Sequence, residues 1–476
     1  MTDLPSSSAS EALRLLGPFP DNWVPARGGI DHDVVIVGGG HTGATFAFAL
    51  QRAGIRRISV IDAAHDEAAS GVWLTRARMN LLRTPKNLAG PELGVQGLSF
   101  QAWYEARHGK QAYADLVRIP RLDWAKYLSW FRATLGLQIR YRTRLLRIEP
   151  AADHLRLHLD IDGTHQVETA RKVILGNGVA GSGYPYLPAV LEALPPHLRA
   201  HTSDVIDIAS LRGKSVAVLG AAASAFDAAG AALEAGAREV HLFARRDHIA
   251  ATPVSRVRGY PGAYDNYRHL PDATRWRQAF RFRDAGSTPT VDAIERAVRF
   301  ANFHIHLSAG WQQAREEDDR IAVELEAGKF YFDFAIAGTG FRVDLARRPE
   351  LAGIAGEVLL WRDRYAPPEA ERDQDLGAHP YLGFGHELLE KTLGAAPQLR
   401  NIHVYNPGGF VSFGLPIGDV PSIRRDVPAV VSAISRDLFF SDIEHHQTRF
   451  VSDIAPEFGE ETWRSAVWSG ARQAAE

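Results

Sequence analysis

Two glycine-rich segments constrain the fold of this chain more than any other feature, because each lies between an apolar, strand-like stretch and a helix-like one. The first runs from Gly38 to Gly43 after residues 33–37, and the second runs from Gly220 to Ala225 after residues 215–219. In such a strand–loop–helix unit the first glycine allows a tight turn, the second admits a pyrophosphate close to the backbone, and the third lets the helix pack on the strand. The sequence therefore predicts two dinucleotide-binding units in one α/β chain.

The first loop has all three glycines and is followed by a predicted helix over 44–53. Asp62 ends the next strand, predicted over 57–61, where a carboxylate can hold a ribose hydroxyl pair. A glycine-rich turn of an unrelated α/β protein is the alternative interpretation. We expect FAD to bind at this loop, through Gly38, Gly40, His41, Thr42, Gly43 and Asp62.

The second loop has alanine in place of the second and third glycines. Alanine is accepted at the third position, whereas a methyl group at Ala222 crowds the pyrophosphate slightly. Arg245 and Arg246 follow the predicted strand 239–243, where NAD-specific proteins carry an acid, and a guanidinium there suits a 2′-phosphate. We expect NADPH to bind through Gly220, Ala222, Ser224, Ala225, Arg245 and Arg246; two solvated surface arginines are the alternative.

Composition excludes several other classes of function. The 54 basic and 56 acidic residues give a formal net charge of −2, with no general attraction to nucleic acid or to anionic membranes. The chain has no cysteine, which excludes disulfides, thiolate metal sites and a dithiol redox relay. It has neither a signal peptide nor an apolar run of the ~18 residues that span a membrane, so a cytoplasmic protein with a small-molecule substrate is expected, and homo-oligomerisation is left open.

The expected fold class is α/β, with two Rossmann-like domains and the NADPH domain inserted into the FAD domain. We expect an N-terminal tail over 1–30, the first part of the FAD-binding domain over 31–205, the NADPH-binding domain over 206–333, and the rest of the FAD-binding domain with C-terminal helices over 334–476. Residues 155–161 and 165–170 predict a hairpin around Asp162-Gly163. Residues 250–310 are aromatic-rich and predict an irregular segment apart from a helix over 291–303, with the aromatic side chains forming either a substrate pocket or core.

Four stretches resemble the class B flavoprotein monooxygenase superfamily, which includes flavin-containing, Baeyer–Villiger and microbial N-hydroxylating monooxygenases. They are the first loop, Ser70-Gly71-Val72-Trp73, the second loop through Asp227, and Ala337-Gly338-Thr339-Gly340-Phe341. The resemblance adds Trp73, Gly178, Gly338, Thr339 and Gly340 to the expected cofactor site. Asp419, in a glycine-rich loop after a late strand, is expected to reach a ribityl hydroxyl, with an ordinary surface turn as the alternative.

Further segments resemble the N-hydroxylating branch: Ala77-Arg78-Met79-Asn80, Lys86-Asn87-Leu88 and Tyr264-Asp265-Asn266-Tyr267. By that match Asn80 and Lys86 line the site, and Asn266 and Tyr267 lie on the substrate side. Arg83 stands where the flavin-containing branch has an oxygen-stabilising asparagine. Structural contacts are the alternative role for Asn80, Arg83 and Lys86.

The resemblance implies a reaction in which NADPH reduces the flavin and a C4a-hydroperoxyflavin formed with O2 passes one oxygen atom to a nitrogen, a sulfur or a carbonyl compound. Arg83, Asn80 and Lys86 are then the candidate catalytic hydrogen-bond donors. An oxidoreductase that does not oxygenate, and a non-catalytic dinucleotide-binding regulator, are the alternatives. His304 and His306 alternate on a predicted strand with no third ligand nearby, so no metal site is predicted.

Overall fold

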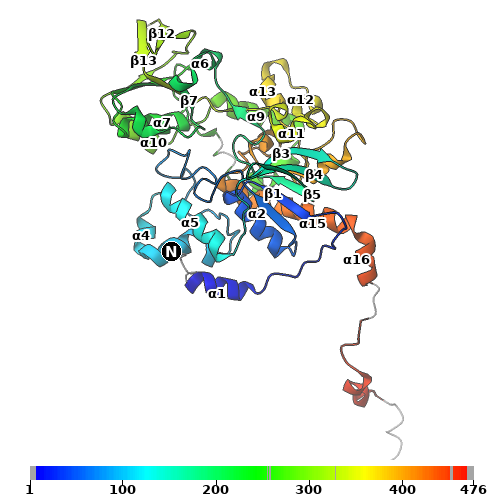
Figure 1. Cartoon of the computed structure of the whole chain (residues 1–476). Coiled ribbons are helices and arrows are strands. Elements are labelled where there is room, and N and C mark those ends of the chain that lie inside the picture. The colour runs from blue at the N-terminus through cyan, green and yellow to red at the C-terminus, as the bar shows by residue number, and fades with distance from the viewer. Residues whose placement is uncertain (1–6, 255, 257–258, 327, 451–453, 469–476) are drawn as a thin grey trace, which may run out of the picture.

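The structure is a computed structural model and describes residues 7–254, 256, 259–326, 328–450 and 454–468 (Figure 1). Residues 1–6 of the predicted N-terminal tail therefore lie outside the described part. The remainder of that tail carries helix α1 (Ser7–Leu16), which begins earlier than the segment 11–16 predicted for it. Within the described residues, no helix is both long and apolar enough to cross a bilayer.

The first sheet has the order β2-β1-β5-β4-β3, with β16 also paired to β5. Strand β5 is long enough to pair with the antiparallel β4 along its first half and with the parallel β16 at its end, while β1 lies on its other side. The strands are β1 (His32–Val37), β2 (Ile58–Ile61), β3 (Thr143–Pro150), β4 (Leu155–Ile161), β5 (Thr164–Leu175) and β16 (Ile402–Val404). The predicted hairpin is confirmed, since Ile161 pairs with Thr164 across a turn in which Asp162 and Gly163 have φ of 51° and 84°.

Helices α2 (His41–Arg52) and α15 (Val420–Ser441) lie side by side beneath this sheet (Figure 1). Helix α15 begins seven residues before the predicted helix 427–438. Pro421 lies in its first turn, where a missing N–H costs nothing, and burial of Val427, Val430 and Ile434 stabilises the helix around the internal Pro428. Helices α3 (Phe100–His108), α4 (Lys110–Asp115) and α5 (Arg121–Thr134), which the sequence did not predict, complete this side.

The second sheet is parallel throughout, with the order β10-β9-β8-β14-β7. Its faces alternate along the strands: Val216 and Val218 pack under α7 (Ala223–Glu234) and α10 (Val291–Val298), whereas Ala217 and Leu219 face a small antiparallel sheet. The main strands are β7 (Arg199–His201), β8 (Ser215–Leu219), β9 (Glu239–Phe243), β10 (Phe303–His306) and β14 (Phe334–Ala337); the small sheet contains β11 (Ala314–Glu317), β12 (Arg320–Leu325) and β13 (Gly328–Phe332).

In sequence, the strands of the second sheet all fall between β5 and β16 of the first. The chain crosses between the two sheets along β6 (Gly183–Pro185) and β15 (Phe341–Val343), which pair antiparallel. The predicted boundaries at 205/206 and 333/334 stay predictions, although two strands of the second sheet, β7 and β14, lie outside the range 206–333. Both β7 and β14 hydrogen-bond within the second sheet, and the buried Ala335 and Ala337 belong to its core.

The aromatic-rich segment is more helical than predicted, with α8 (Pro261–Asn266) and α9 (Asp272–Ala285). Trp276 of α9 is buried with Trp361 and donates from its indole nitrogen to the Glu371 carbonyl at 2.9 Å, so these aromatic rings form core. Helix α10 ends at Val298, and the chain then enters β10. The remaining helices are α6 (Ala189–Glu192), α11 (Pro349–Ala352), α12 (Trp361–Arg364), α13 (Gln374–Gly377), α14 (Phe410–Phe413) and α16 (Ile443–Phe450).

Candidate functional site

In the first glycine loop, backbone segments approach each other so closely that two positions have no room for a side chain. Gly38 has a φ of 108°, and a Cβ on it would lie 2.4 Å from the Gly176 carbonyl oxygen. A Cβ on Gly43 would lie 2.0 Å from the Gly38 carbonyl oxygen. Gly40 differs, because its nearest neighbour would be Gly71 Cα at 3.7 Å. The fold therefore requires glycine at positions 38 and 43, whereas a side-chain methyl group at position 40 would make only an ordinary contact within the protein.

The helices that follow the two loops begin without side-chain caps. Gly40 caps α2 and Ala222 caps α7, and neither helix has an acidic residue in its first turn. By contrast, Thr290 caps α10 and Asp419 caps α15 through their side-chain oxygens. The first-turn N–H groups of α2 and α7, at the positive ends of the helix dipoles, can thus receive phosphate oxygens.

Asp62 lies at the carboxyl end of β2, beside the first loop. Its carboxylate accepts hydrogen bonds from Gly39 N at 2.7 Å, Ala64 N at 2.8 Å and Ser70 Oγ at 2.8 Å. A carboxylate has about four acceptor positions, so one is left for a ligand hydroxyl. This geometry fits the ribose-holding role predicted for Asp62.

His41 joins the first loop to the loop that precedes α15. Its Nε2 lies 3.0 Å from the Gly418 carbonyl oxygen, and burial lowers the pKa of the ring to about 4. The neutral ring therefore donates this hydrogen bond, and it lies 6.0 Å from the Trp73 ring. Thr42 is buried, and a Cβ on Gly176 would lie 2.9 Å from its methyl carbon.

Asp419 lies at the N-terminus of α15, next to Gly418. Its Oδ1 accepts from Ser422 N at 3.0 Å, and burial raises the pKa of the carboxyl to about 6. Capping therefore occupies one of its oxygens.

A polar network at the ends of β5 and β16 was not recognised from the sequence. Asn406 donates to Asn177 Oδ1 at 3.0 Å and accepts from Ser182 Oγ at 2.5 Å and from Gly408 N at 3.0 Å. His379 Nδ1 lies 2.9 Å from the Gly408 carbonyl oxygen, and burial lowers the pKa of this ring to about 4. The only sequence signal was Asn-Pro-Gly-Gly directly after a strand. Gly178, whose φ is 78°, follows Asn177 of this network, at the same sheet edge as the first loop.

The second loop has the same backbone plan. Gly220 has a φ of 118°, and a Cβ on it would lie 2.3 Å from the Gly338 carbonyl oxygen. A Cβ on Gly338 would in turn lie 2.7 Å from the Ala225 methyl carbon. Thr339 donates from its hydroxyl to the Tyr186 carbonyl, and the Gly340 carbonyl lies 3.0 Å from His201 Nε2. Residues 338–340 thus contact both the second glycine loop and the segments near the crossing between the two sheets.

Arg245 and Arg246 are exposed after β9, and Ser224 is exposed in the first turn of α7. Arg246 donates to the Ala285 carbonyl at 3.1 Å, and neither arginine has a carboxylate partner within the described residues. Both guanidinium charges are therefore uncompensated by described acids.

The predicted donor segment 78–86 lies where the two α/β units meet. Arg78 donates to the Thr202 carbonyl at 2.7 Å, and Arg296 of α10 donates to the Arg78 carbonyl at 2.5 Å. Arg83 Nη2 lies 3.5 Å from Asp227 Oδ2 in α7. Asp227 is 7% exposed, and burial raises its pKa while Arg83 opposes that shift.

The other predicted site residues differ in accessibility. The Asn80 side chain is exposed. Lys86 Nζ donates to the carbonyls of Tyr113 and Ala114 at 2.7 and 2.9 Å, which is a structural contact at the end of α4. Asn266 is exposed and donates to the Gly262 carbonyl at 2.9 Å. Tyr267 is buried against Gly414. The catalytic and substrate roles of these four residues stay predictions.

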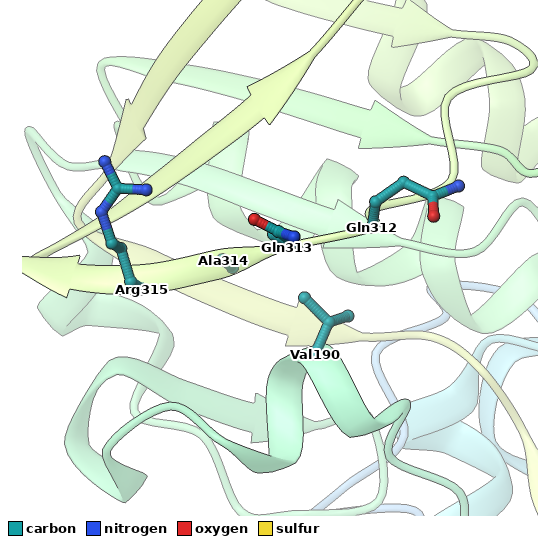
Figure 2. Close-up of a pocket in the computed structure, with 5 residues that line it drawn as sticks. All are labelled: Val190, Gln312, Gln313, Ala314 and Arg315. Atoms are coloured by element: carbon teal, nitrogen blue, oxygen red, sulfur yellow. The ribbon is translucent and has the colours of Figure 1, made fainter.

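A pocket of about 290 Å³ lies between α6 and β11 (Figure 2). Its lining residues are Val190, Gln312, Gln313, Ala314 and Arg315. None of them belongs to either glycine loop, and we assign this pocket no part in the site.

Comparison with known proteins gives consistent results. Residues 32–258 match the model of the pyridine nucleotide-disulphide oxidoreductase family. The chain is 39% identical over 436 residues to a FAD-dependent urate hydroxylase of Xanthomonas campestris pv. campestris, covering 90% of this chain and 91% of that protein.

Three solved structures are similar in fold. L-lysine 6-monooxygenase from Pseudomonas syringae has a TM-score of 0.67 at 19% identity, covering 85% of this chain and 99% of its own. Ornithine hydroxylase from Pseudomonas aeruginosa has a TM-score of 0.64 at 17% identity, covering 86% and 99%. A flavin monooxygenase from Stenotrophomonas maltophilia has a TM-score of 0.53 at 16% identity, covering 86% and 98%.

Proposed function

The chain belongs to the family of the FAD-dependent urate hydroxylase, and its residues 32–258 match the pyridine nucleotide-disulphide oxidoreductase model; we propose that it is a FAD-dependent, NADPH-consuming monooxygenase. We propose urate, or a closely related oxopurine, as the substrate that receives one oxygen atom from O2. This choice rests on the activity of the relative, a FAD-dependent urate hydroxylase, and is narrower than the N-, S- or carbonyl oxygenation expected from the sequence.

Disulfide reduction by a dithiol of this chain is excluded, because the chain has no cysteine. The family match therefore supports two nucleotide-binding units in this chain, but it does not support disulfide reduction by a dithiol of the chain.

One observation carries the cofactor assignment: the open space beside Gly40 at an uncapped helix N-terminus. Gly38 and Gly43 are explained by contacts within the protein, whereas no protein contact explains Gly40. A bound pyrophosphate would explain it, because glycine leaves the most room for the phosphate to approach the α2 N–H groups. Asp62, with one free acceptor position, fits the adjoining ribose.

When bound, FAD would accept reducing equivalents and activate O2; the chain supplies position, charge and exclusion of water. The α2 amides would hold the flavin pyrophosphate, and the N-terminal end of α15 would lie toward the flavin across the His41–Gly418 hydrogen bond. Arg245 and Arg246 would bind a 2′-phosphate. Arg83, at the meeting point of the two units, would donate to the reacting oxygen or to an anionic oxopurine.

We also propose that the segment between β6 and β15 is an NADPH-binding domain inserted into the FAD-binding domain. The order of the strands supports this division, as does the antiparallel pair at which the chain leaves and returns. Helices α8 and α9 depart from the inserted segment and pack against the C-terminal part of the FAD-binding domain.

The test is to purify the protein, identify its chromophore and follow NADPH consumption with and without urate. We expect bound FAD, urate-stimulated consumption, and one atom from ¹⁸O2 in a hydroxylated product for each NADPH. Consumption that yields only H2O2, with urate unchanged, would refute the oxygenation and favour a non-oxygenating oxidoreductase. A protein that neither binds FAD nor oxidises NADPH would refute the assignment altogether.

A further inference from the structure

The described C-terminal segment 454–468 exposes several large apolar side chains. It extends beyond α16, clear of the body of the molecule (Figure 1). Its exposed fractions include 88% for Trp468, 86% for Ile454 and 60% for Phe458, and Trp463 and Val467 are also exposed. Several large apolar side chains exposed in one short segment are typical of a site that contacts a partner.

The segment is acidic and organised by its own contacts. Glu457, Glu460 and Glu461 outnumber Arg464, which pairs with Glu460, so the segment has a net charge of −2. Backbone hydrogen bonds from Thr462 to Gly459 and from Trp463 to Glu460 form one short 3₁₀ turn, and those from Ala466 to Trp463 and from Val467 to Arg464 form a second. Among the described residues, this segment makes no hydrogen bond or ion pair with the rest of the chain.

A cavity of about 400 Å³ with complementary character lies at the C-terminal end of α15. Four cationic side chains line it: Arg27, Arg171, Lys172 and Arg400. Two acidic ones, Asp153 and Asp437, also line it, beside the apolar Pro397, Leu438 and Phe440. The volume lies within the range of sites that hold small ligands or inserted side chains.

The cationic charge of this cavity is only partly compensated. Asp437 alone serves Lys172 at 2.7 Å, Arg436 at 3.3 Å and Arg400 at 3.8 Å. Arg171 is 4% exposed and pairs through Nη2 with Asp442 at 2.7 Å, whereas its Nη1 has no hydrogen-bond partner and lies 3.7 Å from a carboxylate oxygen of Asp33. An incoming carboxylate would therefore meet one buried donor that lacks an acceptor, together with the exposed Arg400.

We propose that the segment 454–468 of one copy of the chain docks in the α15 cavity of a second copy, so that the protein forms a dimer by reciprocal exchange of its C-terminal segments. Aromatic rings would fill the space beside Phe440, and the glutamates would meet Arg400 and Arg171. A two-fold exchange makes each contact twice and closes the assembly.

The anchoring of α16 favours exchange over return to the same chain. His446 of α16 stacks on Phe439 with ring centroids 4.6 Å apart and lies 5.6 Å from the Trp23 ring. Asp442, just before α16, pairs with Arg27 and Arg171 at 2.7 Å each. The helix is thus fixed to the body, and it runs away from the C-terminal end of α15 (Figure 1), where Leu438, Phe440 and Ser441 line the cavity. Phe450, at the exit, is 72% exposed.

The absence of cysteine permits a direct test. Trp463→Cys and Gln398→Cys, the latter in the cavity wall, are made in separate full-length chains, mixed and oxidised. Only a contact between copies can join these two proteins, and we expect a disulfide-linked dimer on a non-reducing gel. Val205→Cys, which is 73% exposed on another surface, replaces Gln398→Cys as the collision control. A linked fraction no greater than that of the control overturns the proposal.

Charge reversal gives an independent readout in solution. Arg400→Glu should weaken self-association about tenfold or more by sedimentation velocity, because a charge-assisted contact is lost and a repulsive one is introduced. The matched control Arg212→Glu, an exposed arginine of the second unit, should leave self-association unchanged. A chain with both Trp463→Cys and Gln398→Cys that links only within itself overturns the exchange, as does a monomeric wild-type protein.

Discussion

Replacing Gly40 and replacing Gly43 should separate binding of the cofactor from stability of the fold. A Cβ at position 40 would meet only Gly71 Cα at 3.7 Å, an ordinary contact, and the backbone there is extended with a φ of −68°. Gly40→Ala should therefore lower the free energy of unfolding by at most about 1 kcal/mol, the cost of alanine at a helix N-cap. The same methyl group would project into the space assigned to the pyrophosphate, so the affinity for FAD should fall at least about tenfold, and Gly40→Val should abolish flavin retention.

Gly43→Ala is the matched control. Its Cβ would lie 2.0 Å from the Gly38 carbonyl oxygen, so β1 and α2 must separate, at a cost of about 1–3 kcal/mol or more. The assays are denaturant unfolding of the apoprotein and titration with FAD, followed by quenching of flavin fluorescence. The reasoning is refuted if Gly40→Ala binds FAD like the wild type, or if it destabilises the apoprotein as much as Gly43→Ala does.

Three further predictions concern other parts of the site. Replacing Arg245 and Arg246 together with alanine should raise the KM for NADPH about tenfold or more and barely change that for NADH, since a charge-assisted phosphate contact contributes about 1.5–3 kcal/mol; equal effects on both coenzymes in steady-state kinetics would contradict the 2′-phosphate assignment. Arg83→Ala should lower the Tm slightly by leaving Asp227 buried without its partner, and adding Asp227→Asn should restore it; because Arg83 is 43% exposed, we expect an effect within about 1 kcal/mol, and a double variant less stable than the single one would argue against the pair. Asp419 has its pKa raised from 3.8 to about 6, so the folded state holds this proton more tightly than the unfolded state does, and the unfolding free energy should fall as pH rises through that window. Asp419→Asn keeps a capping side chain and should flatten the decline; identical pH profiles of the two proteins in denaturant titrations would show that Asp419 does not cause it.

Local chemistry made part of the fold predictable. The glycine loops follow strands, as the sequence predicted. The hairpin at Asp162-Gly163 also forms as predicted, because its turn needs positive φ angles and these two adjacent residues adopt them readily. The resemblance to flavoprotein monooxygenases, drawn from short motifs, is confirmed by the comparisons.

Pairing between distant segments was not predictable from the sequence. The strand at 334–337 is a short apolar run with no mark of which sheet it joins, and only its pairing with β8 and β7 places it in the second. The network around Asn406 unites residues from three separate parts of the chain, so no local spacing indicates it. Lys86 likewise donates a hydrogen bond to a backbone carbonyl of α4, and nothing in the sequence around Lys86 indicates that contact.

The alanine at the third position of the second loop shows how two distant residues share one steric requirement. In the first loop, Gly43 approaches the Gly38 carbonyl directly, and no side chain fits between them. In the second loop, Gly220 closes against Gly338, and the methyl group of Ala225 occupies the space that a side chain at 338 would need. The missing glycine of the second loop is thus compensated by Gly338, more than a hundred residues later in the chain. Loop 220–225 therefore keeps the close packing of strand and helix, and Ala222 places a methyl group at the position that Gly40 holds in the first loop.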